Sequence, residues 1–252
     1  MSGPPRCATN CGTSSPSEGV PDARTETWRV FRSGLASPAY NMALDEGLLE
    51  NAPSVRIPTL RFYGWSEAAA SFGYFQRYAE IEQQTVLRPL VRRPTGGGLV
   101  PHDADWTYSL VFPTGHEWYG LPAIESYRRL HEWVQAAFAR LGVAAELAAE
   151  ARKSAPGHCF VGYERFDLIW RGRKIAGAAQ RRRRDGLLIQ GSVQPPPLRL
   201  DRENWETAML EAAAGRFGAC WQAPPVPEDV RARALALARQ KYSSPEYNRS
   251  RN

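Results

Sequence analysis

Long apolar runs are missing from this chain of 252 residues, since no eighteen consecutive residues are apolar. A membrane-spanning helix needs a run of about that length, so we expect no membrane partner. The N-terminus also lacks the apolar core of a secretory signal. We interpret residues 1–25, which are rich in Ser, Pro, Gly and Thr, as a disordered tail. Residues 26–252 are long enough for one domain with a sizeable core.

Cysteine is scarce, with only Cys7, Cys11, Cys159 and Cys220. No second pair at zinc-ligand spacing follows Cys7 and Cys11, so we expect no metal site. A disulfide framework is not expected in a chain with this much core, which favours a cytoplasmic protein.

Lysine is scarcer still, with Lys153, Lys174 and Lys241 among 32 basic residues and a net charge of +6. A basic surface attracts nucleic acid, anionic lipid or acidic proteins, and composition does not choose among them.

The spacing of apolar residues predicts alternating helices and strand pairs. Ser37 and Pro38 mark the start of a helix, and Gly142 the end of another. The expected helices are 37–51, 123–142, 202–218 and 227–242, and the expected strands lie within 59–65, 90–113, 165–170 and 173–194. This order indicates an α+β fold with a mostly antiparallel mixed sheet packed with helices.

The stretch RRPTGGGLVPHD, residues 92–103, contains three consecutive glycines. Its spacing matches neither a P-loop nor a dinucleotide-binding turn. A backbone without side chains lets a ligand pack directly on it, and its N–H groups can face a phosphate or carbonyl oxygen. Arg92 or Arg93 would add a charged donor, and His102 would hold a polar group. The alternative is a glycine-rich hairpin turn.

Cys159 is a candidate nucleophile in the segment GHCF, beside His158. A thiolate needs a nearby cation at neutral pH, and Lys174 on the next predicted strand would supply it. Gly177 and Ala178 keep that strand thin, which leaves room for an elongated ligand. The alternatives are a buried apolar cysteine and an edge-strand lysine that discourages aggregation.

Four arginines, Arg181–Arg184, fall at the tip of a predicted hairpin whose turn includes Asp185 and Gly186. They suit phosphates, a solvated turn or docking of an acidic protein. No RNA-binding or helix-turn-helix signature accompanies them.

Four motifs together resemble the lipoate–protein ligase and octanoyltransferase family. They are NMALDEGLL, RRPTGGGLVPHD, FDLIWRGRKIAGAAQRRRRDGLLIQGSV and KYSSPEYN, in this order between about residues 28 and 245. The resemblance implies that residues 26–252 are a catalytic domain with an α+β fold shared with biotin protein ligases. It also implies a tunnel for an eight-carbon acyl chain. One departure from the family pattern is Pro101, because the family usually has a bulky residue before the histidine. A proline also cannot donate a backbone hydrogen bond.

The resemblance also implies roles for individual residues. Cys159 is similar in position to the nucleophile of the octanoyltransferase branch, and Lys174 would reach the acyl carbonyl. The substrate-binding residues it implies are Arg93, Gly96, Gly97, Gly98, His102, Gly177 and Ala178. The implied reaction moves octanoyl, or lipoyl, from acyl carrier protein through a cysteine thioester to a lysine of a lipoyl domain.

The partners that this branch implies are acyl carrier protein and lipoyl-domain proteins, such as glycine cleavage H protein or dehydrogenase E2 subunits, with no nucleic acid and no cofactor. An ATP-dependent lipoate ligase, which would need ATP and lipoate, is the main competing function. Ligases often carry an accessory C-terminal domain, and this chain ends soon after KYSSPEYN. The same motifs also suit a lipoyl-domain amidotransferase, or a catalytically inactive homologue that binds acyl-proteins or nucleic acid.

Overall fold

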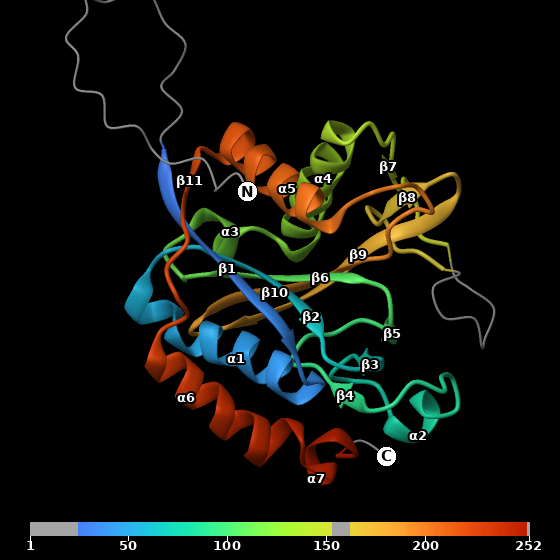
Figure 1. Ribbon diagram of the computed structural model, residues 1–252, viewed down its shortest axis with the longest axis vertical. Coiled ribbons are helices and arrows are strands. Elements are labelled where there is room, and N and C mark those ends of the chain that lie inside the picture. The colour runs from blue at the N-terminus through green and yellow to red at the C-terminus, as the bar shows by residue number, and fades with distance from the viewer. Residues whose placement is uncertain (1–24, 153–161, 251–252) are drawn as a thin grey trace, which may run out of the picture.

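The computed structural model describes residues 25–152 and 162–250 (Figure 1). The tail expected at residues 1–25 therefore lies, apart from Thr25, outside the described residues. Two sheets organise the described part of the chain. The large sheet has eight strands in the order β11 (Ala219–Gln222), β1 (Glu26–Ala36), β2 (Thr59–Trp65), β6 (Trp106–Phe112), β10 (Gly186–Val193), β9 (Arg173–Arg183), β8 (Leu168–Trp170) and β7 (Glu146–Leu147). Only β11, β1 and β2 pair in parallel within it, so the predicted α+β fold with a mostly antiparallel mixed sheet is confirmed.

Helices cover both faces of the large sheet (Figure 1). One face carries α4 (Ala123–Arg140) and α5 (Arg202–Phe217), and the other carries α1 (Pro38–Val55) and α6 (Glu228–Leu237). Successive side chains of a strand point to opposite faces. On β6, Tyr108, Leu110 and Phe112 therefore join the core under α4 and α5, whereas Val111 packs under α1.

Local sequence sets the start of α1 as predicted. The Ser37 hydroxyl accepts the Tyr40 amide at 3.3 Å, and Pro38 occupies the first turn, where it leaves no amide unpaired. The short helices are α2 (Tyr78–Ile81), α3 (Glu117–Gly120) and α7 (Pro245–Asn248), and the π-helix η1 (Ala238–Tyr242) continues α6.

The small sheet excludes one alternative that the sequence left open. Its order is β4 (Leu90–Arg92), β3 (Ala69–Phe72) and β5 (Val100–His102). The alternative interpretation of the glycines is a hairpin turn between the two flanking strands, but β3 lies between those strands and pairs with both. The pairing partner comes from residues 69–72, which local turn chemistry does not reveal.

Two smaller expectations also change. The turn between β9 and β10 consists of Arg184 and Asp185, and Gly186 already pairs with Arg183. Cys220 on β11 is disulfide-bonded, although the cysteine content predicts no disulfide framework. Within the described residues, no helix has both the length and the apolar character needed to cross a bilayer.

A buried ion pair joins α1 to the large sheet. The Arg61 guanidinium on β2 lies 2.7 Å from the Asp45 carboxylate on α1, and neither side chain is exposed. Asp45 also accepts hydrogen bonds from Tyr63, Ser109 and Gln190, which lie on β2, β6 and β10. These donors satisfy a charge that burial would otherwise make very unfavourable.

Replacing Arg61 with Met should lower the free energy of unfolding by about 3–5 kcal/mol, because Asp45 would keep a buried charge without its cation. Denaturant unfolding measures this loss. The matched control is Arg32→Met, because Arg32 pairs with Glu206 while 43% of its side chain is exposed. That loss should stay below about 1 kcal/mol, and equal losses in the two variants would contradict a ranking by burial.

Candidate active site

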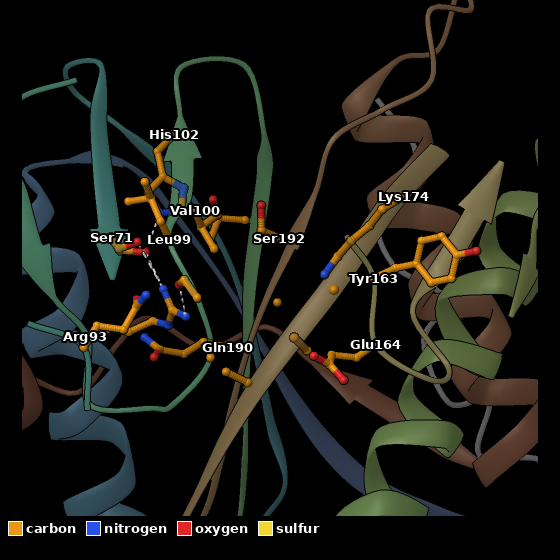
Figure 2. Close-up of a pocket in the computed structure, with 18 of the residues that line it drawn as sticks. Ser71, Arg93, Leu99, Val100, His102, Tyr163, Glu164, Lys174, Gln190 and Ser192 are labelled. Atoms are coloured by element: carbon orange, nitrogen blue, oxygen red, sulfur yellow. Dashed lines mark hydrogen bonds between the residues drawn. The ribbon is translucent and has the colours of Figure 1, made fainter. Parts of the chain in front are cut away.

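A cavity of about 630 Å³ lies between the small sheet and strands β9 and β10 (Figure 2). Its volume is typical of a site for a small ligand. Figure 2 shows Ser71, Arg93 and His102 on one side and Lys174 and Tyr163 on the other.

The structure brings most of the predicted site residues to this cavity. Those that line it are Arg93, Gly97, Gly98, His102, Lys174, Gly177 and Ala178. Gly96 is not among the lining residues, but its carbonyl is bound by Arg93. Cys159 lies outside the described residues, and so does His158.

Arg93 anchors the glycine turn between β4 and β5. Its guanidinium makes five hydrogen bonds, which equals the number of its N–H groups. The acceptors are the carbonyls of Gly96 (3.0 Å from Nε and 2.7 Å from Nη2), Gly98 (2.6 Å) and Ser71 (3.2 Å) and the Ser71 hydroxyl (3.2 Å). Burial lowers the pKa of Arg93 to about 10, which still leaves it charged at neutral pH. Arg93 therefore positions the turn and, in this arrangement, has no N–H left for a ligand.

The backbone amides of the glycine turn can serve a ligand. Among the described residues, no group accepts a hydrogen bond from the N–H of Gly96, Gly97 or Gly98. Gly97 has a φ of +83°, a conformation that favours glycine. The turn also touches Gly73 so closely that a Cβ there would lie 1.9 Å from the Gly97 carbonyl oxygen. Gly97 and Gly98 thus present bare backbone to the cavity.

Lys174 projects from β9 toward the cavity (Figure 2). Its ammonium lies 2.7 Å from Oδ2 of Asp167, whose side chain is fully buried. β9 pairs with β10 and β8, so Lys174 is not on an edge strand. A Cβ on Gly177 would lie 2.6 Å from Lys174 Cε and 2.7 Å from Nζ. The missing side chain of Gly177 thus provides the space that the lysine occupies.

Asp167 receives further donors. Its carboxylate accepts the Tyr127 hydroxyl and, at 2.7 Å, the Glu164 amide. Burial, followed by the charge of Asp167, raises the pKa of Tyr127 well above its usual value, so Tyr127 keeps its proton and donates. Burial lowers the pKa of the neighbouring His131 to about 4, which makes it neutral at pH 7.

His102 is held at both ring nitrogens. Nδ1 lies 2.9 Å from Oδ2 of Asp105, and Nε2 lies 2.8 Å from the Ser71 hydroxyl. The imidazole stacks on Trp65 with a centroid separation of 3.8 Å. His102 therefore has two polar partners, Asp105 and Ser71, that the sequence did not predict.

Sequence reasoning also missed other residues of the site. Gln190 forms part of the floor and links Asp45 to Thr95, beside the glycine turn. Asp167 contacts Lys174, and Tyr127 contacts Asp167. In the sequence, neither residue differs from an ordinary polar residue of its segment. The one signal for Asp167 is its position in FDLIW, a few residues before the lysine motif.

The remaining arginines do not lie where the sequence predicts. Arg92 does not face the cavity; it donates to the carbonyls of Tyr74, Gln76, Tyr247 and Asn248. Of Arg181–Arg184, the first three lie within β9, where they bond Pro94, Leu121 and Glu46 respectively. Only Arg184 is at the tip, with its side chain 96% exposed. The four arginines therefore do not form one exposed docking cluster.

Known proteins resemble this chain in sequence and in fold. The family described as the lipoyl protein ligase A/B catalytic domain matches residues 37–194. The octanoyltransferase LipM of Geobacillus kaustophilus (strain HTA426) is 39% identical over 181 residues, and that of Bacillus subtilis (strain 168) is 40% identical over the same length. In both, the alignment covers 67% of this chain and 65% of the relative.

A crystal structure of lipoate-protein ligase A bound with ATP resembles the fold with a TM-score of 0.75 and 20% identity, covering 90% of this chain and all of that one. An α+β domain with a cavity that is walled on one side by glycine backbone is the class of protein that the fold and the site define. The chain belongs to the lipoyl protein ligase A/B catalytic-domain family. It spans about 65% of the length of the curated relatives it matches.

Gly177→Ala should displace the Lys174 ammonium from Asp167, because the new methyl group would lie within 3 Å of the flexible end of that side chain. We expect the variant to stay folded, with a thermal midpoint within a few degrees of the unaltered protein, and to lose activity. The matched control is Gly215→Ala on α5, where an added Cβ meets no heavy atom within 4 Å. Full activity in Gly177→Ala would show that the lysine position is unimportant.

His131 should make the stability of the fold depend on pH. Its pKa is about 4 in the fold and about 6.5 when unfolded. Between these values the unfolded chain binds the additional proton. The free energy of unfolding should therefore fall as the pH falls from about 6.5 to about 4, by up to about 3 kcal/mol. Denaturant titrations at several pH values measure the slope, and His131→Gln should flatten it. An unchanged slope in that variant would place the titrating group elsewhere.

Proposed function

We propose that this protein is an octanoyltransferase of protein lipoylation. It takes an octanoyl group from acyl carrier protein onto Cys159 and transfers it to a lysine of a lipoyl domain. The observation that carries the proposal is the cavity itself. It has glycine backbone on one side and, on the other, a lysine that is paired with a buried carboxylate.

The cavity suits an unbranched acyl chain. Leu99, Val100, Ala178 and Met42 line it alongside the bare backbone of Gly97 and Gly98. Burying the seven carbons beyond an octanoyl carbonyl is worth about 6 kcal/mol, at roughly 0.8 kcal/mol for each carbon. The sequence similarity to two octanoyltransferases supports this chain length.

Lys174 supplies the positive charge that thioester chemistry needs. Asp167 fixes the ammonium from one side, and Gly177 leaves room for it. An ammonium near a thiol lowers the thiol pKa and also stabilises the negative charge that develops on an attacked carbonyl. The amides of the glycine turn provide further donors for that oxygen.

Chain connectivity supports Cys159 as the nucleophile. The residues that flank the undescribed segment, Arg152 and Gly162, both line the cavity. Arg152 and Tyr163 are also joined by two backbone hydrogen bonds, of 2.7 and 3.0 Å. Cys159 is three residues from Gly162 in the sequence.

The reaction is written as two acyl transfers. The Cys159 thiolate attacks the carbonyl carbon of the donor thioester, the bond to the donor sulfur breaks, and that thiolate leaves and takes up a proton. The neutral amine of the lipoyl-domain lysine then attacks the new thioester and gives up one N–H proton to water. The amide forms and Cys159 leaves as a thiolate. Splitting one transfer into two steps replaces a direct reaction between two large partners.

An ATP-dependent ligase is the second candidate, and one observation favours it. The amides of Gly96, Gly97 and Gly98, which have no acceptor among the described residues, suit phosphate oxygens as well as a carbonyl. In that reaction ATP would activate lipoate, and Cys159 would have no part.

The test is an intact-mass measurement after incubation with octanoyl-acyl carrier protein. An octanoyl adduct should appear and map to Cys159 by peptide mass. Cys159→Ser should abolish turnover, because a serine hydroxyl is hardly ionised at neutral pH. Lys174→Ala should slow alkylation of Cys159 by iodoacetamide near neutral pH, since the thiol pKa rises. If no adduct forms, yet Cys159→Ala still modifies a lipoyl domain with ATP and lipoate, the protein is a ligase.

A further inference from the structure

We propose that Ser71, His102 and Asp105 form a second catalytic centre in the cavity, which hydrolyses acyl thioesters through an ester on Ser71. The three side chains come from β3, β5 and the turn that follows β5. Asp105 Oδ2 lies 2.9 Å from His102 Nδ1, and His102 Nε2 lies 2.8 Å from Ser71 Oγ. This is the chain of contacts by which a carboxylate and an imidazole activate a serine, and it is recognised by geometry on unrelated folds.

The surrounding hydrogen bonds determine the direction of each proton. A carboxylate only accepts, so His102 carries its proton on Nδ1 and donates it to Asp105. Asp105 Oδ2 also accepts from Thr107 at 2.9 Å and from Ser192 at 2.7 Å, which holds the carboxylate in place. Nε2 is then an acceptor, and the Ser71 hydroxyl points its proton at it.

Arg93 completes the environment of the serine. Its Nη1 donates to Ser71 Oγ at 3.2 Å, so a buried cation stabilises the oxygen as it loses its proton. The same guanidinium binds the carbonyls of Gly96 and Gly98. One side chain therefore spans the serine and the turn whose amides can stabilise an oxyanion.

The location matches the substrate class. Ser71 is only 2% exposed and His102 only 5%, yet both line the cavity. Trp65 stacks on the imidazole and fixes its plane. A nucleophile placed there meets a ligand inside the cavity. That the ligand is a medium-chain acyl thioester rests on the proposed function.

The reaction balances with water as the only co-reactant. Ser71 Oγ attacks the thioester carbonyl, His102 takes the hydroxyl proton, and the carbon–sulfur bond breaks. The leaving sulfur takes up that proton and departs as a thiol. Water, deprotonated by His102, then attacks the ester, and Ser71 leaves with the proton restored. The products are a free fatty acid and a thiol.

A structural role for the same contacts makes a different prediction. If the hydroxyl only orders His102 and Arg93, its removal changes stability but no serine chemistry exists to be lost. Covalent labelling separates the two, because an alkyl fluorophosphonate reacts with a serine that has an activating base and hardly at all with others.

The experiment treats the full chain with octyl fluorophosphonate and maps the adduct by peptide mass. Ser71 should be labelled in the unaltered protein and in Cys159→Ala. Labelling should be at least about 100-fold slower in His102→Gln and Asp105→Asn, because each removes the base or its orientation. The matched control is Ser243→Ala, which removes an exposed serine and should label like the unaltered protein.

Hydrolysis is followed on the Cys159→Ala background as thiol release from octanoyl-coenzyme A. Ser71→Ala should reduce it at least about 100-fold, with the thermal midpoint reporting the fold. Ser71→Cys keeps the size of the side chain. In this variant the octanoyl group should be held as a thioester on residue 71, which neutral hydroxylamine cleaves rapidly.

The outcomes separate the two proposals. Absence of a Ser71 adduct, labelling that does not respond to His102→Gln, or thiol release that persists in Ser71→Ala would each overturn the serine centre. An octanoyl adduct that never forms on Cys159, with Ser71 still labelled, would instead refute the transferase and leave the serine centre standing.

Discussion

The buried guanidinium of Arg93 is the contact on which the rest of the site depends. Three bare glycines would ordinarily sample many conformations, because glycine has the greatest backbone freedom. Arg93 removes that freedom by bonding the carbonyls of Gly96 and Gly98 and, at its other end, Ser71 on β3. With the carbonyls occupied, the amides of the turn are left for a ligand. The hydrogen bonds of Arg93 thus both order the turn and leave its amides available to a ligand.

The opposite wall of the cavity is also built on a buried charged group, but there the signs of the charges are exchanged. There a buried carboxylate, Asp167, holds a partly exposed cation, Lys174, and Gly177 provides the space. Both walls place an ionised group where burial would be costly, and both compensate it with several hydrogen bonds. The Asp45 network beneath the cavity connects the glycine-turn wall to α1 through Gln190 and Thr95.

Much of the fold could be predicted from local patterns. The helix start at Ser37 and Pro38, the amphipathic helix ending near Gly142 and the strand at 59–65 all appear as expected. These signals depend on neighbours in sequence, through capping and periodicity. The alternative of a hairpin turn around the glycines was wrong, because β3 separates its strands. Strand pairing is a long-range choice, and a strand of four residues such as β3 carries little signal of its own.

The sequence by itself determined the family, the α+β class and the residues with unusual local chemistry: the glycine triplet, His102 and the rare Lys174. Only the tertiary structure decided what those residues do. It turned Arg93 inward to the backbone and engaged Arg181, Arg182 and Arg183 within the domain. It also brought Asp167 to Lys174 and set Ser71 and Asp105 on either side of His102. The physical reason is that a polar side chain is defined by its partners, and burial brings those partners from strands that are distant in the chain.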